Sequence, residues 1–414
     1  MKKNILTIVA LCLTTFSYAQ TGREKKVLFI IADGIPADVI EKVNTPNIDR
    51  IVKSGSYTRM YMGGNKGTYN QTPTISAVGY NSLLTGTWVN KHNVPDNDIK
   101  EPNYRYHNIF RMLKEQFPDK KTAVFSSWLD NRTKLVGHHL AEAGNVPVDA
   151  YFDGYELDTV NFPHDDKKEY MRKIDEKVTH EAASYVQKHG PDLSWVYLQY
   201  TDDMGHRYGD SPQFYSAVEK MDAQVGKIWD AISYRQKNYK EDWLLIITTD
   251  HGRSEKDGRG HGGQSDRQRG IWMVTSYPDL NNYAKLYDPA IVDILPSMAN
   301  FMGLKIPKET LQEMDGVPLI GKVSVADLKV NYFQDQLDLT WKALQNSGTV
   351  KVWVSTTNNF KKGKPDHYEL MGEFPVQQKH ALINVKEMPS TFYKVVLEGA
   401  DNRINHWVVP EQMP

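Results

Sequence analysis

Continuous apolar runs divide the first two thirds of the chain, and three of them lead directly into an aspartate. These runs are 27–32 before Asp33, 195–200 before Asp202, and 244–248 before Asp250. An uninterrupted apolar run of this length is typical of a strand buried on both faces of a parallel sheet. Two further strands are predicted at 122–126 and 271–275.

The segments between these runs carry the three-to-four-residue apolar spacing of amphipathic helices. The predicted helices are 45–54, one beginning near Ser76 and covering 77–85, 107–116, 167–188, 212–234 and 288–302. Alternation of strands and helices predicts an α/β fold, a doubly wound and mostly parallel sheet flanked by helices. Ligands of such sheets bind beyond the carboxyl ends of the strands, so we expect the three aspartates to share one edge.

The pattern changes after about residue 321. Short apolar–polar alternations separated by turn residues occupy 350–354, 381–385, 393–397 and 405–409. They predict a small β-sandwich at the C-terminus that resembles a fibronectin type III domain. The expected organisation is a signal peptide over 1–19, an α/β domain over 20–325 and a sandwich over 326–414.

The N-terminus has the three parts of a secretory signal. Lys2 and Lys3 precede an apolar stretch over 5–13, and small residues at Ser17 and Ala19 predict cleavage after Ala19. We therefore expect export, to a periplasm or beyond. No later run reaches the roughly 18 apolar residues of a membrane span.

The single cysteine lies inside this signal, at position 12, so the mature chain is expected to have none. A disulfide, a thiolate metal site and a cysteine nucleophile are thereby excluded. The 50 basic and 51 acidic residues nearly cancel, which gives no reason to expect a nucleic-acid or membrane partner. The sequence does not indicate an oligomeric state.

The candidate chemistry lies in aspartates and histidines close to the predicted strand ends. Singly, each short motif is more typical of a surface loop. Together they form a nitrogen–oxygen ligand set that suits zinc, and two divalent ions can act on one phosphoryl group. The candidate ligands are Asp33, Asp202, His206, Asp250, His251 and His261.

Two-metal chemistry of this kind needs a nucleophile, and residues 72–86 (TPTISAVGYNSLLTG) offer Ser76 at a predicted helix start. Unpaired amides and the helix dipole favour an anion there. Gly86 follows Ser76 by ten positions, after a threonine. In this the segment resembles the nucleophile segment of the alkaline phosphatase superfamily, and further motifs follow in the expected order over about 26–321.

The resemblance implies a ligand set and a mechanism. Ser76 would attack phosphorus and form a phosphoserine, which water would then hydrolyse. One metal ion, expected to be Zn²⁺, would lie among Asp33, Ser76, Asp250 and His251, and a second Zn²⁺ among Asp202, His206 and His261. The substrate is expected to be a small-molecule phosphate ester.

Departures from the superfamily's branches guide the choice of substrate. Sulfatases carry a proline and an arginine after the nucleophile, which are absent from 77–80 here. The nucleotide pyrophosphatase/phosphodiesterase branch is expected to carry threonine with an asparagine three positions later, whereas this chain has Ser76 and Gly79. Asn81, Arg132 and Lys134 are candidates to bind the phosphate instead.

The serine nucleophile favours phosphomonoesters, with a phosphodiesterase or nucleotide pyrophosphatase as the alternative. A phosphomutase of the same superfamily is disfavoured by the export signal. A binding protein on an inactive scaffold, acting through the sandwich, is disfavoured by the complete ligand set. Arg253, Lys256 and Arg259 are predicted to form a solvated basic loop.

Overall fold

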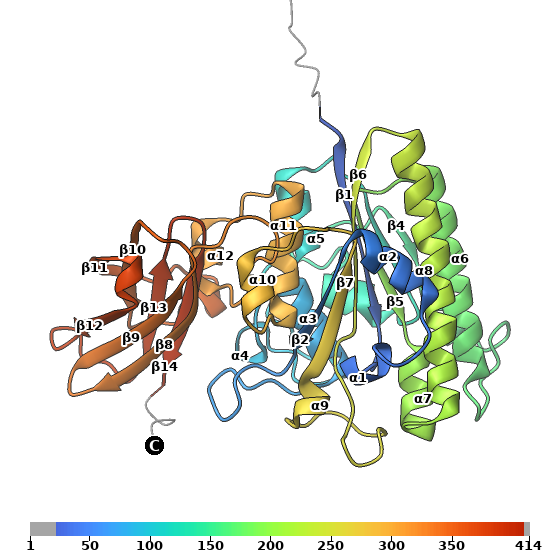
Figure 1. Cartoon of the computed structure of the whole chain (residues 1–414), viewed down its shortest axis with the longest axis horizontal. Coiled ribbons are helices and arrows are strands. Elements are labelled where there is room, and N and C mark those ends of the chain that lie inside the picture. The colour runs from blue at the N-terminus through green and yellow to red at the C-terminus, as the bar shows by residue number, and fades with distance from the viewer. Residues whose placement is uncertain (1–21, 410–414) are drawn as a thin grey trace, which may run out of the picture.

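The computed structural model describes residues 22–409 and contains a seven-stranded sheet covered by helices on both faces (Figure 1). The strand order is β2 (Ser56–Tyr61), β7 (Gly270–Thr275), β6 (Glu241–Thr248), β1 (Glu24–Ala32), β5 (Leu193–Leu198), β3 (Thr122–Ser126) and β4 (Ala150–Phe152). Neighbouring strands are parallel, except that β7 is antiparallel to both β6 and β2. The predicted α/β fold is confirmed.

Alternate residues of β1 enter two different hydrophobic cores. Val27, Phe29 and Ile31 belong to one cluster, and Leu28 and Ile30 belong to the cluster on the other face. This is why the strand reads as a continuous apolar run in the sequence, because both faces of the sheet are covered.

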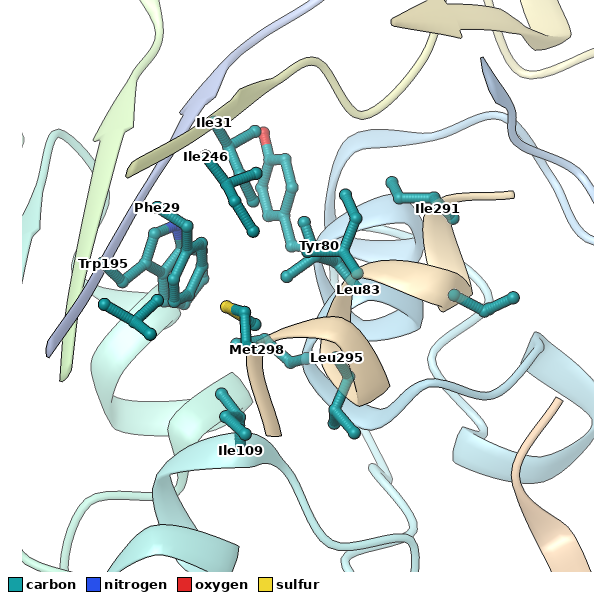
Figure 2. Close-up of a cluster of buried hydrophobic side chains, with 14 of the residues drawn as sticks. Phe29, Ile31, Tyr80, Leu83, Ile109, Trp195, Ile246, Ile291, Leu295 and Met298 are labelled. Carbon is teal, nitrogen blue, oxygen red and sulfur yellow. The ribbon is translucent and has the colours of Figure 1, made fainter. Parts of the chain in front are cut away.

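One face of the sheet packs on three helices: α3 (Ser76–Thr85), α5 (Ile109–Gln116) and α11 (Ile294–Met302). Figure 2 shows Phe29 and Trp195 of the sheet against Tyr80 of α3 and Met298 of α11. The Phe29 and Trp195 rings are stacked, with centroids 5.8 Å apart. The nucleophile candidate is therefore part of a helix anchored in this core.

The opposite face packs on α2 (Pro46–Ser54), α6 (Glu169–His189), α7 (Tyr200–Tyr208) and α8 (Pro212–Asn238). Helices α6 and α8 lie side by side along the right of Figure 1. The shorter helices are α1 (Ala37–Ile40), α4 (Val89–His92), α9 (Asp266–Arg269), α10 (Asn282–Leu286) and α12 (Lys308–Glu313). All six predicted helices have a counterpart, although the last begins only at Ile294.

Two antiparallel sheets form the C-terminal part of the chain. The first has the order β11 (Glu369–Pro375), β10 (Thr349–Ser355), β13 (Tyr393–Glu398) and β14 (Arg403–Val408). The second has the order β12 (His380–Asn384), β9 (Gln336–Ala343) and β8 (Val325–Phe333). Their inward-facing residues share a third hydrophobic cluster, which includes Leu337, Val352 and Val395.

The predicted signal peptide and Cys12 lie outside the described residues. Within 22–409, no helix combines the length and apolar character needed to cross a membrane.

Candidate active site

Two clusters of potential metal ligands lie at the carboxyl edge of the sheet. Asp33 directly follows β1, and Asp250-His251 follows β6 after one intervening threonine. These three residues are buried, and their ligand atoms lie within 4.8 Å of one another. We call them the first ligand set.

A second ligand set, with the same spacing limit, consists of Asp202, His206 and His261. Asp202 and His206 are one turn apart on α7, so helical geometry puts both on one face. His261 comes from the loop after β6, and its Nε2 lies 3.0 Å from Nε2 of His206. His206 is exposed, so this set is more open to solvent than the first.

The two sets touch through their histidines, because the rings of His251 and His261 stack with centroids 3.8 Å apart. Nδ1 of His251 lies 2.9 Å from the Gly252 carbonyl, and Nδ1 of His261 lies 2.9 Å from the Thr74 carbonyl. A carbonyl only accepts, so each Nδ1 carries the proton and each Nε2 keeps its lone pair. This is the arrangement that orients a metal-binding histidine.

The carboxylates of the first set are each half satisfied. Oδ2 of Asp33 accepts hydrogen bonds from the hydroxyls of Tyr80 and Tyr197, the latter at 2.7 Å. Oδ1 of Asp250 accepts from the Gly34 amide at 3.1 Å. Asp33 Oδ1 and Asp250 Oδ2 are buried and have no hydrogen-bond partner among the described residues. An orphaned buried carboxylate oxygen is costly unless a cation or donor meets it.

The pKa values of the site residues also indicate that these carboxylates need a cation beside them. Burial, together with the negative charge of Asp202, raises the pKa of Asp33 to about 7. Burial and the neighbouring carboxylates of Asp33 and Asp202 raise the pKa of Asp250 well above its usual range. Burial lowers the pKa of His251, which keeps it neutral. Two buried carboxylates and a third, part-buried one beside the neutral imidazole of His251 fit divalent cations, and nitrogen and oxygen donors suit zinc.

Ser76 begins α3 and lies beside the first set, with its Oγ 3.3 Å from Nε2 of His251. The N-cap residue Ile75 makes no side-chain hydrogen bond to the helix, and of the first-turn amides that of Ala77 is bonded to the Asn97 side chain. The first-turn amides other than that of Ala77 are therefore available to an anion, and the helix dipole favours negative charge there. Tyr80 lies one turn later on the same helix and reaches Asp33, so α3 links the hydroxyl to the first set.

A cavity of about 320 Å³ adjoins Ser76 and both sets. It is lined by Asp33, Ser76, Tyr80, Asn97, Trp128, Glu156, His164, Tyr170, Met171, Tyr197, Gln199 and Asp202. Asn97 contacts the helix start, because its Oδ1 accepts a hydrogen bond of 2.9 Å from the Ala77 amide. That bond fixes the side-chain amide and leaves its NH₂ group available as a donor.

The predicted phosphate-binding residues do not gather at this cavity. Arg132 is held by Asp153 through two bonds of 2.7 and 3.0 Å, and Lys134 pairs with Asp130 at 2.8 Å. Asn81 is buried within α3 and is absent from the cavity lining.

Gly79, the position expected to carry a phosphate-binding asparagine, packs against Asp250. A Cβ there would lie 2.8 Å from the Asp250 carbonyl oxygen. No side chain fits without a shift of the first ligand set. Asn97 was not among the predicted phosphate-binding residues, because it follows Ser76 by twenty-one positions and no motif spacing indicates it.

The prediction of a solvated basic loop is wrong for Arg253, whose side chain is 0% exposed. The other residues missed from sequence are Tyr80 and Tyr197. The spacing of Tyr80 from Ser76, one helical turn, was an available signal. Tyr197 lies on a buried strand and looks like an ordinary core residue.

The model of one protein family, described as type I phosphodiesterase / nucleotide pyrophosphatase, matches residues 27–275. Human ectonucleotide pyrophosphatase/phosphodiesterase family member 7 is 26% identical over 255 residues, which cover 58% of this chain and 50% of the human protein. Venom phosphodiesterase 2 of Crotalus adamanteus is 24% identical over 243 residues, covering 56% of this chain and 28% of that protein. The chain spans about half the length of the first curated relatives it matches.

Solved structures show the same fold at low identity. Ps i-CgsB, crystallised with k-i-k-neocarrahexaose, has a TM-score of 0.51 and 15% identity, with 84% of this chain and 86% of that chain covered. The 2-O GAG sulfatase BT1596 has a TM-score of 0.51 and 11% identity, with 88% and 86% covered. Among the predicted activities, the family match favours the phosphodiesterase alternative over the preference for phosphomonoesters.

Proposed function

Since the chain belongs to the type I phosphodiesterase / nucleotide pyrophosphatase family of the alkaline phosphatase superfamily, and is therefore a phosphoric ester hydrolase, we propose that it hydrolyses small-molecule phosphodiesters with Ser76 as nucleophile. The observation that carries the proposal is the position of the Ser76 hydroxyl. It lies at the N-terminus of α3, 3.3 Å from Nε2 of His251, and lines the cavity with Asp33 and Asp202.

The two ligand sets fit divalent metal ions, for which zinc is the proposed identity. The first ion would be held by Asp33, Asp250, His251 and Ser76, and the second by Asp202, His206 and His261. Such ions, when bound, supply Lewis acidity at the phosphoryl oxygens and lower the pKa of a hydroxyl or water.

The protein's own groups would orient the reaction. The Ser76 oxygen attacks phosphorus and loses its proton, while the bond from phosphorus to one ester oxygen breaks and that alcohol leaves with a proton. Water then cleaves the seryl phosphodiester, which releases the phosphomonoester and restores the Ser76 hydroxyl. The side-chain NH₂ group of Asn97 and the first-turn amides of α3 other than that of Ala77 are placed to donate to the non-bridging oxygens. Tyr80 and Tyr197 hold the Asp33 carboxylate in place during both steps.

Export remains part of the proposal. The charged, apolar and small-residue segments at 1–19 support it. Accumulation of a shortened chain outside the cytoplasm, with its N-terminus at residue 20, is the expected outcome.

The direct test is Ser76→Ala, with hydrolysis of bis-para-nitrophenyl phosphate and para-nitrophenyl phosphate measured beside the zinc content. We expect the wild-type protein to prefer the diester. We expect Ser76→Ala to lose roughly a thousandfold or more in kcat, because removing a covalent nucleophile leaves only binding and electrostatic contributions.

Ser82→Ala is the matched control. Ser82 is a buried hydroxyl on the same helix that bonds to the Val78 carbonyl at 2.7 Å and faces His92 instead of the cavity. Its variant should keep its turnover. Full activity of Ser76→Ala would refute the nucleophile, and a preference for the monoester would refute the proposed substrate class.

A further inference from the structure

Arg253 has a fully buried guanidinium that bridges the loops bearing the metal-ligand candidates. Its Nε donates to the Gly34 carbonyl at 2.8 Å, next to Asp33. One terminal nitrogen donates to the Asp202 carbonyl at 2.8 Å and also to Oδ1 of Asp202. The other donates to the Arg259 carbonyl at 3.1 Å, in the loop that leads to His261.

Two glycines of the motifs make room for this side chain. A Cβ at Gly205 would fall on the guanidinium, and one at Gly34 would lie 2.6 Å from its terminal nitrogen. Gly205 is the glycine of the Asp-x-x-Gly-His motif, between Asp202 and His206. Its missing side chain leaves the space that the Arg253 guanidinium occupies. The ring of Phe214 closes the other side, with its centroid 5.4 Å from the guanidinium carbon.

The two ligand sets differ in how they are supported. Within the described residues, Asp33 is held by two tyrosine hydroxyls and Asp250 by the Gly34 amide, without help from Arg253 at either carboxylate. Asp202 instead accepts a charge-assisted hydrogen bond from Arg253 at Oδ1, while its Oδ2 lies 3.3 Å from Nε2 of His206. Arg253 therefore leaves one Asp202 oxygen directed toward the second set.

We propose that Arg253 is a positioning residue that fixes the second ligand set, Asp202, His206 and His261, for its metal ion. The first set depends on it less, because Arg253 reaches that set only through the backbone of Gly34. The inference rests on the proposed function only in that both sets bind metal. A guanidinium suits this role because its donors form a rigid planar fork, whereas an ammonium supplies the charge without that geometry.

The test measures metal binding instead of turnover. Zinc is titrated into wild-type protein and Arg253→Met in competition with a chromophoric chelator, and Co²⁺ spectra report occupancy of each site. We expect the zinc affinity of the second set to fall roughly 10- to 100-fold, as for other partners that orient metal ligands, and that of the first set to change much less. Arg253→Lys is expected to stay impaired, because charge alone does not restore the fork.

Arg235→Met is the matched control. Arg235 is also buried, pairs with Glu241 and donates to the Gln187 carbonyl at 3.3 Å, away from both ligand sets. This variant should lower thermal stability and leave both zinc affinities unchanged.

If Arg253→Met does not fold, Gly205→Ala provides the second variant, since its methyl group displaces the guanidinium while the charge remains. Equal weakening of both sites, or of neither, overturns the positioning role. A wild-type protein that binds fewer than two ions overturns this inference and the two-metal part of the proposed function together. An active Ser76→Ala with a selective Arg253 effect overturns the nucleophile alone.

Discussion

His92 is a buried histidine that makes the stability of this fold depend on pH. Its Nδ1 accepts a hydrogen bond of 3.1 Å from the Val94 amide. Its Nε2 lies 3.1 Å from Oγ of Ser82, whose own proton goes to the Val78 carbonyl. Nε2–H must therefore be the donor, and only the neutral ring satisfies both contacts. A proton on Nδ1 would face the Val94 N–H.

Burial lowers the pKa of His92 from 6.5 to about 3. The unfolded chain therefore takes up a proton at a higher pH than the native protein does. Stability is fully present above the unfolded pKa and is lost as pH falls from about 6.5 toward 3. From the two pKa values, the contribution of His92 to the free energy of unfolding should fall by about 2 kcal/mol between about pH 7.5 and about pH 5.

The measurement is reversible denaturant unfolding of the zinc-loaded protein at several pH values, for wild type and His92→Gln. Titration of the active-site residues contributes to both curves and cancels in their difference. The difference in free energy of unfolding between wild type and His92→Gln should therefore narrow by about 2 kcal/mol between about pH 7.5 and about pH 5. His180→Gln, on the exposed face of α6, controls for loss of a histidine. A difference between wild type and His92→Gln that does not change with pH would refute the reasoning.

Two predictions concern the cavity beside Ser76. Asn97→Ala should lower kcat/KM for bis-para-nitrophenyl phosphate by roughly 10- to 100-fold, because a hydrogen bond to a charged oxygen is lost. Its zinc content should not change. A variant with wild-type kcat/KM would show that Asn97 does not bind the substrate. Glu156 has a buried Oε2 without a partner in the described residues, and it lines the same cavity. Glu156→Gln should raise kcat/KM at alkaline pH roughly three- to tenfold for the dianionic monoester, and less for the monoanionic diester. The reason is that repulsion between the Glu156 carboxylate and the substrate scales with substrate charge. Equal gains for the two substrates would contradict this.

The buried strands were predictable from sequence because both of their faces lie in a core. Four of the five predicted strands of the central sheet end where predicted, and the fifth differs because a long-range contact decides its end. The apolar run 195–200 predicts a strand to Tyr200, yet β5 ends at Leu198 and α7 begins at Tyr200. The amides of Gln199 and Tyr200 donate to the Asp175 carboxylate at 3.1 and 2.8 Å. Asp175 lies on α6, so no local pattern around 199 shows this helix start.

The strands of the C-terminal sandwich were also predicted only in part. Four of its strands were recognised as short alternations, whereas β8, β9 and β11 were not assigned individually. Strand β8 alternates buried and exposed residues, and β11 is mostly exposed at the edge of its sheet. A strand with one open face contains enough polar residues to resemble a loop in a single sequence.

The ligand candidates were predictable because their position at strand ends is a property of the sheet. The groups that orient them were not, since they approach from elsewhere in the chain. Tyr197 reaches Asp33 across the sheet, and Arg253 looks like one charge of a basic loop until its burial is known. Burial of a charged side chain is decided by space, here the space left by Gly34 and Gly205.

Close packing at Gly79 excludes a phosphate-binding side chain from the position where the family motif is expected to carry one. Any side chain three residues after Ser76 would meet the Asp250 backbone, so a polar group on that turn of α3 would displace part of the first ligand set. An amide for the substrate must then come from outside the helix, and Asn97 approaches from a loop to bond the Ala77 amide. The glycine that looked like a missing phosphate-binding residue is thus a condition for close packing of α3 against Asp250. The departure from the expected motif is consequently no evidence against diesterase activity.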